Sequence, residues 1–362
     1  MHLDEHDDPW NTPDEGAERE TPQPNEESQG IPPLPPKADT EWQPPNPAMQ
    51  QINIAVSRVR EELHKLIIGQ DEMLELLMAA LFSGGHVLLE GVPGIAKTLT
   101  AKLMAQAMEV DFSRIQFTPD LMPSDVVGTT VFNMQQSSFS FKAGPVFSNV
   151  VLIDEINRAP AKTQAALFEV MEEYQVTVDG ETYPMSLPFF VIATQNPIEQ
   201  EGTYKLPEAQ LDRFLIKINL QYPSLDEEKL ILRRFRSDFG MAQRSTVRPV
   251  FNAQEIQECQ ALVQQVHIKD ELLDYIAAIV HDTRNNGDLF LGASPRASLA
   301  IMKMAKAIAA MRGRDFVTPD DIQYVAYPVL NHRVMLTPER EMEGYTTREV
   351  VQSIIQKIEV PR

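Results

Sequence analysis

The segment EGVPGIAKTLT, residues 90–100, contains most of a phosphate-binding pattern, G-x-x-x-x-G-K-[ST]. Gly91, Lys97 and Thr98 match the pattern, whereas Ala96 stands where the second glycine is usual. An apolar run, HVLL, precedes the segment and a helical pattern, KTLTAKLMAQAM, follows it, which is the strand–loop–helix context that the motif requires. In that context the backbone N–H groups would wrap a β-phosphate, Lys97 would reach the β- and γ-oxygens, and the Thr98 hydroxyl would ligate magnesium.

Ala96 is the position where the loop departs from the pattern. Glycine is needed where φ must be positive or where a side chain would clash. Because Ala96 immediately precedes the expected helix, we expect a right-handed conformation there, in which alanine still supplies its N–H. The alternative is a chance Gly/Lys turn in an apolar, helix-rich sequence. The loop residues expected to bind nucleotide are Gly91, Val92, Pro93, Gly94, Ile95, Ala96, Lys97, Thr98 and Leu99.

Two adjacent carboxylates follow a second apolar run, in the segment NVVLIDEINRAP. Four apolar residues lead directly into Asp154 and Glu155, which places both acids at the carboxyl end of a buried strand. Asp154 would hold magnesium through water, and Glu155 would act as the general base that activates an attacking water. The alternative is a strand that ends in a solvated acidic turn.

Three further polar residues stand at the ends of expected elements. Asn196 ends the run FFVIATQNP, where it could orient the water between Glu155 and the γ-phosphate. Arg213, in LPEAQLDRFLI, could neutralise transition-state charge on a nucleotide held by an adjacent subunit; the alternative is a surface arginine paired with Asp212. Arg296, in LGASPRASLA, lies in the first turn of a helix and suits an anion, with a structural salt bridge as the alternative.

The elements that must position these residues are short apolar runs, which alternate with helical patterns along the chain. Such alternation predicts an α/β fold with a five-stranded parallel sheet and helices on both faces. The predicted strands are 86–89, 114–117, 150–153, 189–194 and 214–218. After Pro223 the strand patterns stop, and helical patterns predict a second, all-helical domain. Its predicted helices cover about 225–239, 253–266, 270–283, 295–311 and 318–328.

The first 47 residues have a different composition from the rest. They contain 12 of the 52 acidic residues, 2 of the 32 basic residues and 11 of the 27 prolines. Such a segment cannot bury enough apolar surface to offset its chain entropy, so we expect a disordered acidic tail. The expected organisation is therefore a tail over 1–47, an α/β core over 48–223, a helical domain over 224–330 and a C-terminal extension over 331–362.

The net charge of −20 argues against a large nucleic-acid interface, which needs clustered lysine and arginine. Cys259 is the only cysteine, so an intramolecular disulfide is excluded. The acidic start MHLDEHDDPW has no apolar core of a secretory signal, and no apolar run approaches the roughly 18 residues of a membrane span. We therefore expect a soluble cytoplasmic protein.

In combination, these segments resemble the AAA+ ATPases, and specifically the MoxR family, over about residues 50–330. The resemblance implies Walker A residues at Lys97 and Thr98, Walker B residues at Asp154 and Glu155, sensor 1 at Asn196, an arginine finger at Arg213 and sensor 2 at Arg296. The segment IIGQ, which includes Gly69 and Gln70, resembles the part of such proteins that packs against adenine. Alanine in place of the second loop glycine also occurs within that family.

Two segments of alternating residues predict β-hairpins, one within about 121–145 and one within about 175–188, the latter with Asp179-Gly180 at its tip. They resemble the helix-2 insert and the pre-sensor hairpin of an AAA+ branch that includes the magnesium chelatase motor subunit. In rings of that branch both elements face the pore, so they could couple hydrolysis to a partner. The alternative is that they are passive loops that cover the sheet edge.

The resemblance implies an ATP-driven motor with Mg²⁺ as cofactor, in which Arg213 serves the neighbouring protomer of a hexameric ring. MoxR-like proteins act as chaperones that mature or remodel protein complexes, often with a separate von Willebrand factor A (VWA) domain partner; the sequence does not identify the client. One alternative is a nucleotide-gated scaffold with little turnover, against which the presence of Glu155, Asn196 and Arg213 argues. Others are a nucleic-acid motor and magnesium chelatase itself.

Overall fold

The computed structural model describes residues 46–92, 94–134, 137–197, 204, 206–236 and 247–361, and these form one compact unit. The acidic tail predicted for residues 1–47 lies almost entirely outside these ranges, and so does Pro93 of the predicted loop. Within the described ranges, no helix has both the length and the apolar composition needed to cross a membrane.

A five-stranded parallel sheet forms the centre of the unit, with the strand order β2-β5-β8-β1-β9. The strands are β1 (Val87–Glu90), β2 (Phe112–Gln116), β5 (Val150–Asp154), β8 (Phe190–Gln195) and β9 (Ile216–Asn219). Each coincides with one of the predicted apolar runs, so the predicted α/β fold is confirmed. The register pairs Gln116 with Asp154 and Glu90 with Gln195, which brings the carboxyl ends of the strands to one edge of the sheet.

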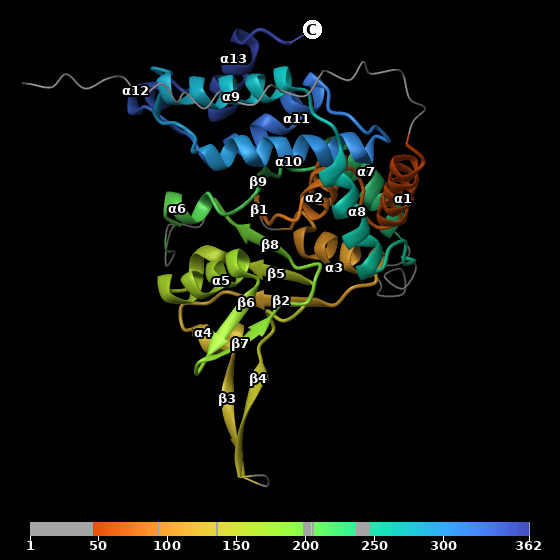
Figure 1. The fold of residues 1–362 in the computed structure, drawn as a ribbon, viewed down its shortest axis with the longest axis vertical. Coiled ribbons are helices and arrows are strands. Elements are labelled where there is room, and N and C mark those ends of the chain that lie inside the picture. Colours follow the sequence, from red (N-terminus) through yellow and green to blue (C-terminus); the bar gives the residue numbers. More distant parts are fainter. Residues whose placement is uncertain are drawn as a thin grey trace, which may run out of the picture. The chain divides into compact units, whose positions relative to one another are not determined.

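Helices cover both faces of the sheet (Figure 1). Alternate residues of each strand point to opposite faces. In β5, Val150 and Leu152 join the core formed with α1, α2 and α3, whereas Val151 and Ile153 join the core formed with α5. The helices of this half are α1 (Pro47–His64), α2 (Asp71–Phe82), α3 (Lys97–Ala107), α4 (Pro123–Val127), the 3-10 turn Ile156–Arg158, α5 (Ala161–Glu173) and α6 (Glu208–Leu211).

The helical domain after the sheet forms the lid. Its helices are α7 (Leu225–Phe235), α8 (Ala253–Gln265), α9 (Asp270–Asn285), α10 (Pro295–Met311), α11 (Pro319–Leu330), α12 (Pro338–Met342) and α13 (Thr347–Lys357). Ser294 caps α10 and Thr318 caps α11, each followed by proline at the first helical position. A short antiparallel pair that the sequence did not suggest, β10 (Leu289–Leu291) with β11 (Met335–Leu336), lies among these helices.

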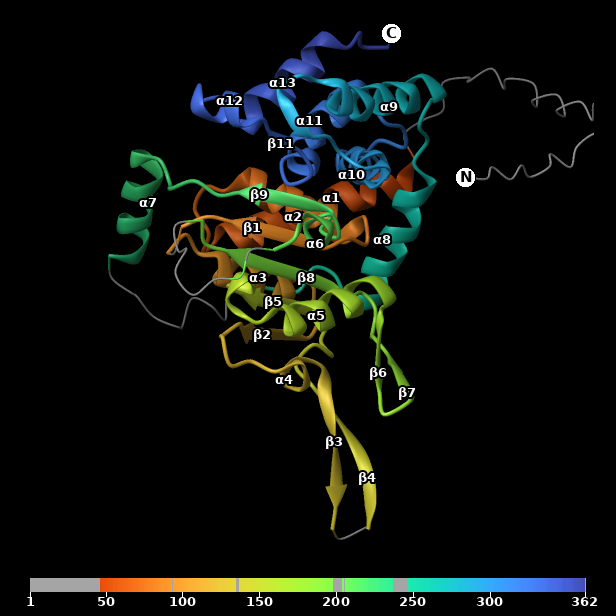
Figure 2. The same ribbon diagram turned by 90° about the vertical axis from the view of Figure 1, so that its left-hand side faces the viewer.

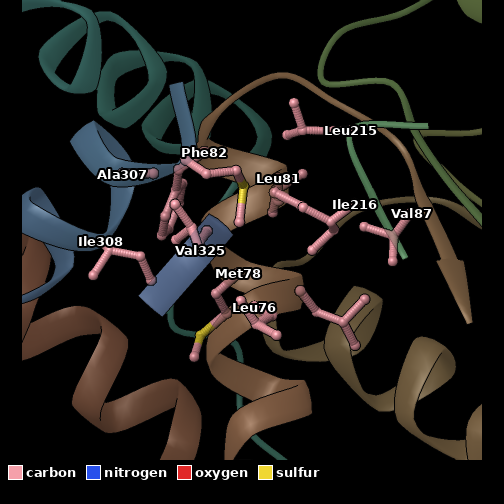
Figure 3. Close-up of a cluster of buried hydrophobic side chains, with 14 of the residues drawn as sticks. Leu76, Met78, Leu81, Phe82, Val87, Leu215, Ile216, Ala307, Ile308 and Val325 are labelled. Atoms are coloured by element: carbon pink, nitrogen blue, oxygen red, sulfur yellow. The ribbon is translucent and has the colours of Figure 1, made fainter. Parts of the chain in front are cut away.

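The lid shares its core with one face of the sheet. Side chains from α2, β1, β9, α10 and α11 meet in a single buried cluster (Figure 3). Because this burial is continuous, the lid helix α10 is packed directly on α1 and α2. The residues labelled in the figure are Leu76, Met78, Leu81, Phe82, Val87, Leu215, Ile216, Ala307, Ile308 and Val325.

Two antiparallel hairpins extend from the sheet on the side away from the lid (Figure 2). The longer one pairs β3 (Gly128–Asn133) with β4 (Ser138–Ala143), and the shorter one pairs β6 (Gln175–Val178) with β7 (Glu181–Pro184). The turn of the shorter hairpin has positive φ at Asp179 (53°) and Gly180 (86°), as a two-residue primed turn requires. Phe141 of β4 stacks on Tyr183 of β7 with 4.0 Å between ring centroids, which joins the two hairpins.

Candidate functional site

The loop between β1 and α3 has Ala96 in the left-handed region, with φ 59° and ψ 18°. The expectation of a right-handed conformation at this position was therefore wrong. Ala96 is the N-cap of α3, and an N-cap residue normally lies outside the helical region because the helix begins only at the next residue. A left-handed conformation costs a non-glycine residue about 1–2 kcal/mol, which explains why glycine is usual here.

Lys97 and Thr98 begin α3 and point into a cavity of about 470 Å³. The Lys97 ammonium donates to the carbonyl oxygen of Gly91 over 2.7 Å. Burial lowers the pKa of Lys97, and the nearby carboxylates of Asp154, Glu155 and Glu90 oppose this shift. A cation in this place is partly desolvated and faces the space that the loop encloses.

Asp154 is the last residue of β5 and is almost fully buried, with 8% of its surface exposed. Its Oδ1 accepts a hydrogen bond from the Thr194 hydroxyl over 2.9 Å. Its Oδ2 accepts from Arg114 Nε over 2.8 Å and lies 3.4 Å from the Thr98 hydroxyl oxygen. One carboxylate oxygen is thus held by the neighbouring strand β8, and the other faces the cavity.

Glu155 has a left-handed backbone, with φ 58° and ψ 54°, and its N–H donates to the Thr194 hydroxyl over 3.0 Å. Non-glycine residues with such strain are concentrated at functional sites. The side chain is held by two residues, since its Oε2 accepts from Gln116 Nε2 over 2.8 Å and forms an ion pair with Arg158 over 3.1 Å.

The cavity brings together eight of the sixteen site residues predicted from sequence. Those that line it are Gly94, Ala96, Lys97, Thr98, Leu99, Asp154, Glu155 and Asn196. Gly91, Val92 and Ile95 belong to the same loop without lining the cavity. Sequence reasoning missed four lining residues, Lys102, Arg114, Gln116 and Thr194. Arg114 and Gln116 are two positions apart on β2, so they share a face beside Asp154; the strand order, which the sequence does not state, is what places them there.

Gly69 and Gln70 lie between α1 and α2. The Gln70 amide donates to the carbonyl of Ile95 over 3.2 Å, which links this segment to the loop. Gln70 also lines a second cavity of about 260 Å³, with Tyr222 and the lid residue Tyr327. Its Oε1 is buried and has no hydrogen-bond partner among the described residues. A buried acceptor of this kind fits a ligand that donates a hydrogen bond.

Arg213 and Arg296 do not reach the 470 Å³ cavity. Both form ion pairs with the carboxylate of Glu172 on α5: Arg213 with Oε2, and Arg296 with Oε1 over 3.1 Å. They line a separate cavity of about 230 Å³ that also contains Lys303, and no described residue lines both cavities. The alternative partner considered for Arg213, the neighbouring Asp212, is engaged elsewhere.

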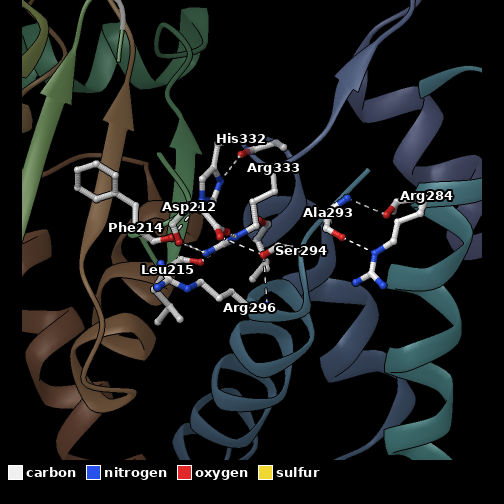
Figure 4. Close-up of polar contacts among 12 residues, drawn as sticks. Asp212, Phe214, Leu215, Arg284, Ala293, Ser294, Arg296, His332 and Arg333 are labelled. Carbon is white, nitrogen blue, oxygen red and sulfur yellow. Dashed lines mark hydrogen bonds and ion pairs between the residues drawn. The ribbon is translucent and has the colours of Figure 1, made fainter. Parts of the chain in front are cut away.

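Asp212 joins the core to the lid (Figure 4). One carboxylate oxygen accepts from Arg333 Nε over 2.7 Å, and the other accepts from the Ser294 hydroxyl over 3.0 Å. The Arg333 guanidinium also donates to the carbonyls of Phe214 and Leu215. Burial lowers the pKa of Arg333, and Asp212 opposes this shift. The segments that contain Arg213 and Arg296 are therefore fixed to each other.

Comparison with known proteins places this geometry in a family. A family model described as "ATPase family associated with various cellular activities (AAA)" matches residues 86–216, and a model described as "AAA lid domain" matches residues 281–354.

Relatives of similar length match most of the chain. A protein of Bacillus subtilis named YeaC is 45% identical over 86% of this chain and 97% of its own length. Chaperone MoxR1 of Mycobacterium tuberculosis is 43% identical over 83% of this chain and 81% of its own. A crystal structure from Cytophaga hutchinsonii superposes with a TM-score of 0.81 at 42% identity and covers 87% of this chain and 98% of that one. This chain belongs to the MoxR family of AAA+ ATPases.

Proposed function

We propose that the protein hydrolyses ATP in the 470 Å³ cavity and uses the energy, within a ring of identical subunits, to remodel a partner protein. The observation that supports this most directly is the convergence of Lys97, Thr98, Asp154, Glu155 and Asn196 on one cavity at the carboxyl edge of a parallel sheet. That edge is where open α/β sheets bind their ligands.

The oxygen donors of the cavity fit Mg²⁺. The Thr98 hydroxyl and Asp154 Oδ2 are 3.4 Å apart, and hydroxyl, carboxylate and phosphate oxygens are the ligands that magnesium prefers. We assign the metal to these two residues, where it would offset the charge of the phosphates. Lys97 would leave the Gly91 carbonyl to contact the phosphate oxygens.

Glu155 is the proposed general base and takes a proton from the attacking water. Its Oε2 is bound to Gln116 and Arg158 in this structure, so we expect these contacts to open when the water is positioned. Asn196, which is buried at the end of β8, would orient that water.

The base of the nucleotide is assigned to the second cavity, beside Gly69 and Gln70. Adenine presents an exocyclic amine, which is a donor, and the buried acceptor Oε1 of Gln70, which has no partner within the described part of the chain, suits it. Because guanine presents a carbonyl at the same ring position, this acceptor favours ATP over GTP.

Arg213 and Arg296 are assigned to the nucleotide of a neighbouring subunit. Both share Glu172 and line a cavity separate from the chain's own Lys97 and Asp154, which supports action in trans for both arginines. Such a site is complete only in an assembly, and the ring is the closed form in which every subunit receives a neighbour's arginines. A hexamer is the size that the family resemblance implies.

Remodelling of a client, with a VWA-domain protein as partner, is proposed from the MoxR resemblance and from the hairpins. The β3–β4 hairpin exposes Phe132, Met134 and Phe139, by 52%, 86% and 73%. Clustered exposed apolar side chains mark contact surfaces for other proteins. Because its proposed substrate is ATP, we place the protein in the cytoplasm.

A mixing experiment tests the proposal. Glu155→Gln lacks the base but keeps Arg213, whereas Arg213→Ala lacks the arginine but keeps Glu155, so each variant alone should be inactive. In a mixture, an Arg213→Ala subunit beside a Glu155→Gln subunit regains a complete site, and phosphate release should return. If the mixture stays as inactive as its components while both still bind ATP and assemble, Arg213 does not act in trans. If the wild type itself binds ATP and assembles without turnover, the protein is a nucleotide-gated scaffold.

A further inference from the structure

We propose that Arg114 is a positioning residue that stands in for the divalent cation: it holds the metal-facing oxygen of Asp154 until Mg²⁺ arrives with the nucleotide. The inference rests on the proposed function, because it assumes that Thr98 and Asp154 bind the metal. It assigns a role to a residue of β2 that the sequence motifs do not include.

The two carboxylate oxygens of Asp154 have different hydrogen-bond partners. Oδ1 is engaged with the buried Thr194 hydroxyl over 2.9 Å. Oδ2 receives both Nε and Nη2 of Arg114, over 2.8 and 2.7 Å, and is also the oxygen that lies 3.4 Å from Thr98. The guanidinium therefore occupies the one oxygen of Asp154 that faces the threonine with which the metal would be shared.

The charge of Asp154 requires such a partner. A carboxylate that is 8% exposed is costly to bury without a cation. Lys97 does not fill this role, because its ammonium is bound to the carbonyl of Gly91. Among the described residues, Arg114 is the basic side chain that forms an ion pair with Asp154.

Arg114 is also able to leave. About half of its side chain is exposed (51%), so its charged end can leave Asp154 and regain its hydration in water. Its other contact is a 3.3 Å hydrogen bond to Gln116, at the solvent side of the cavity. Binding of the metal is then an exchange, in which one cation replaces another on Oδ2.

This exchange has a measurable consequence. Because Mg²⁺ must compete with Arg114, the free Mg²⁺ concentration that supports nucleotide binding is higher than the bare carboxylate would need. Removal of the guanidinium should lower it. A partly exposed ion pair of this kind corresponds to a shift of about two- to fivefold.

The test is ADP binding by isothermal titration calorimetry at a series of free Mg²⁺ concentrations. For Arg114→Gln, the half-saturating Mg²⁺ concentration should fall about two- to fivefold relative to wild type. Lys102→Gln is the matched control, since Lys102 lines the same cavity and has the same charge without contact to Asp154. The Lys102→Gln variant should bind ADP more weakly by the same factor at every Mg²⁺ concentration. Its half-saturating Mg²⁺ concentration should equal that of wild type.

A second measurement separates this effect from misfolding. In EDTA without nucleotide, Arg114→Gln should unfold at a lower temperature than wild type, because Asp154 is left unpaired; saturating Mg²⁺ and ADP should remove most of the difference. An unchanged or increased half-saturating Mg²⁺ concentration in Arg114→Gln, or an equal shift in Lys102→Gln, overturns the inference and leaves the proposed function standing. Failure of the wild type to bind ADP at any Mg²⁺ concentration overturns both.

Discussion

Asp212 and Arg333 form an ion pair across the junction of the sheet and the lid, with 2.7 Å between the carboxylate Oδ1 and the guanidinium Nε. Arg333 is nearly inaccessible, with 3% of its side chain exposed. Because Asp212 precedes Arg213 directly and also binds Ser294, the N-cap of the helix that contains Arg296, this pair fixes the orientation of both proposed trans-acting arginines.

Replacement of Arg333 by methionine should destabilise the protein strongly. The change removes the guanidinium from Asp212 Oδ1 and from the carbonyls of Phe214 and Leu215, and loss of one partner of a buried pair costs about 3–5 kcal/mol. Urea unfolding monitored by circular dichroism measures the loss. Arg340→Met, which removes a partly exposed arginine paired with Asp288 and Glu343, is the control and should have a much smaller effect. Equal losses in the two variants would contradict the role given to Arg333.

Replacement of Ala96 by glycine should stabilise the protein. Glycine relieves the left-handed strain of about 1–2 kcal/mol, and the added flexibility of the unfolded chain offsets about half of that gain. The expected net change is therefore about 0.5–1 kcal/mol in the free energy of unfolding. Ala105→Gly, in the right-handed interior of α3, is the matched control and should destabilise by about 1 kcal/mol or more. If both changes destabilise, the conformation of Ala96 in solution is not the one described.

The sheet and the main site residues were predictable from the sequence because buried parallel strands are continuous apolar runs. Once Asp154 and Asn196 are seen to end such runs, the common edge of the sheet brings them to the loop that contains Lys97. The conformation of Ala96 was predicted wrongly because the residue directly before the helix was expected to share the right-handed conformation, whereas this N-cap residue is left-handed.

The contacts of Arg114 and Glu172 could not be predicted. Arg114 reaches Asp154 because β2 lies next to β5, and strand order depends on the packing of the whole sheet. Glu172 binds Arg213 and Arg296 from segments far apart in the chain, so its role follows only from how the lid packs on the core. No local pattern encodes either relationship.

Replacement of Glu155 by glutamine should stop hydrolysis while ATP binding remains. Glutamine keeps the size of the side chain and removes the basic oxygen, so phosphate release should fall by about a hundred- to ten-thousandfold. Phosphate release and ATP affinity are measured on the same preparation. Glu169→Gln, an exposed carboxylate on α5, is the control and should turn over normally. A Glu155→Gln protein that retains near wild-type turnover would assign the base to another residue.

The buried His86 should make the protein acid-sensitive. The His86 Nδ1 accepts a hydrogen bond from the N–H of Val191, and Nε2 lies 3.1 Å from the carbonyl oxygen of Met171, which fits a neutral ring protonated on Nε2. Burial lowers the pKa of His86 from 6.5 to about 4. Between these values the unfolded chain binds a proton that the native state does not. The free energy of unfolding is therefore not reduced by this group above about pH 6.5. It falls by about 3 kcal/mol as the pH drops to about 4.

Urea unfolding at several pH values between about 7 and 4.5, for wild type and for His86→Gln, isolates this contribution. The variant should be less stable at neutral pH, because glutamine fills the site less well. Its stability should nevertheless decline less steeply with falling pH, since the titrating ring is gone. His332, whose pKa is also lowered by burial, remains in both proteins and cancels in the comparison. Parallel curves for the two proteins would show that His86 does not contribute to the acid sensitivity.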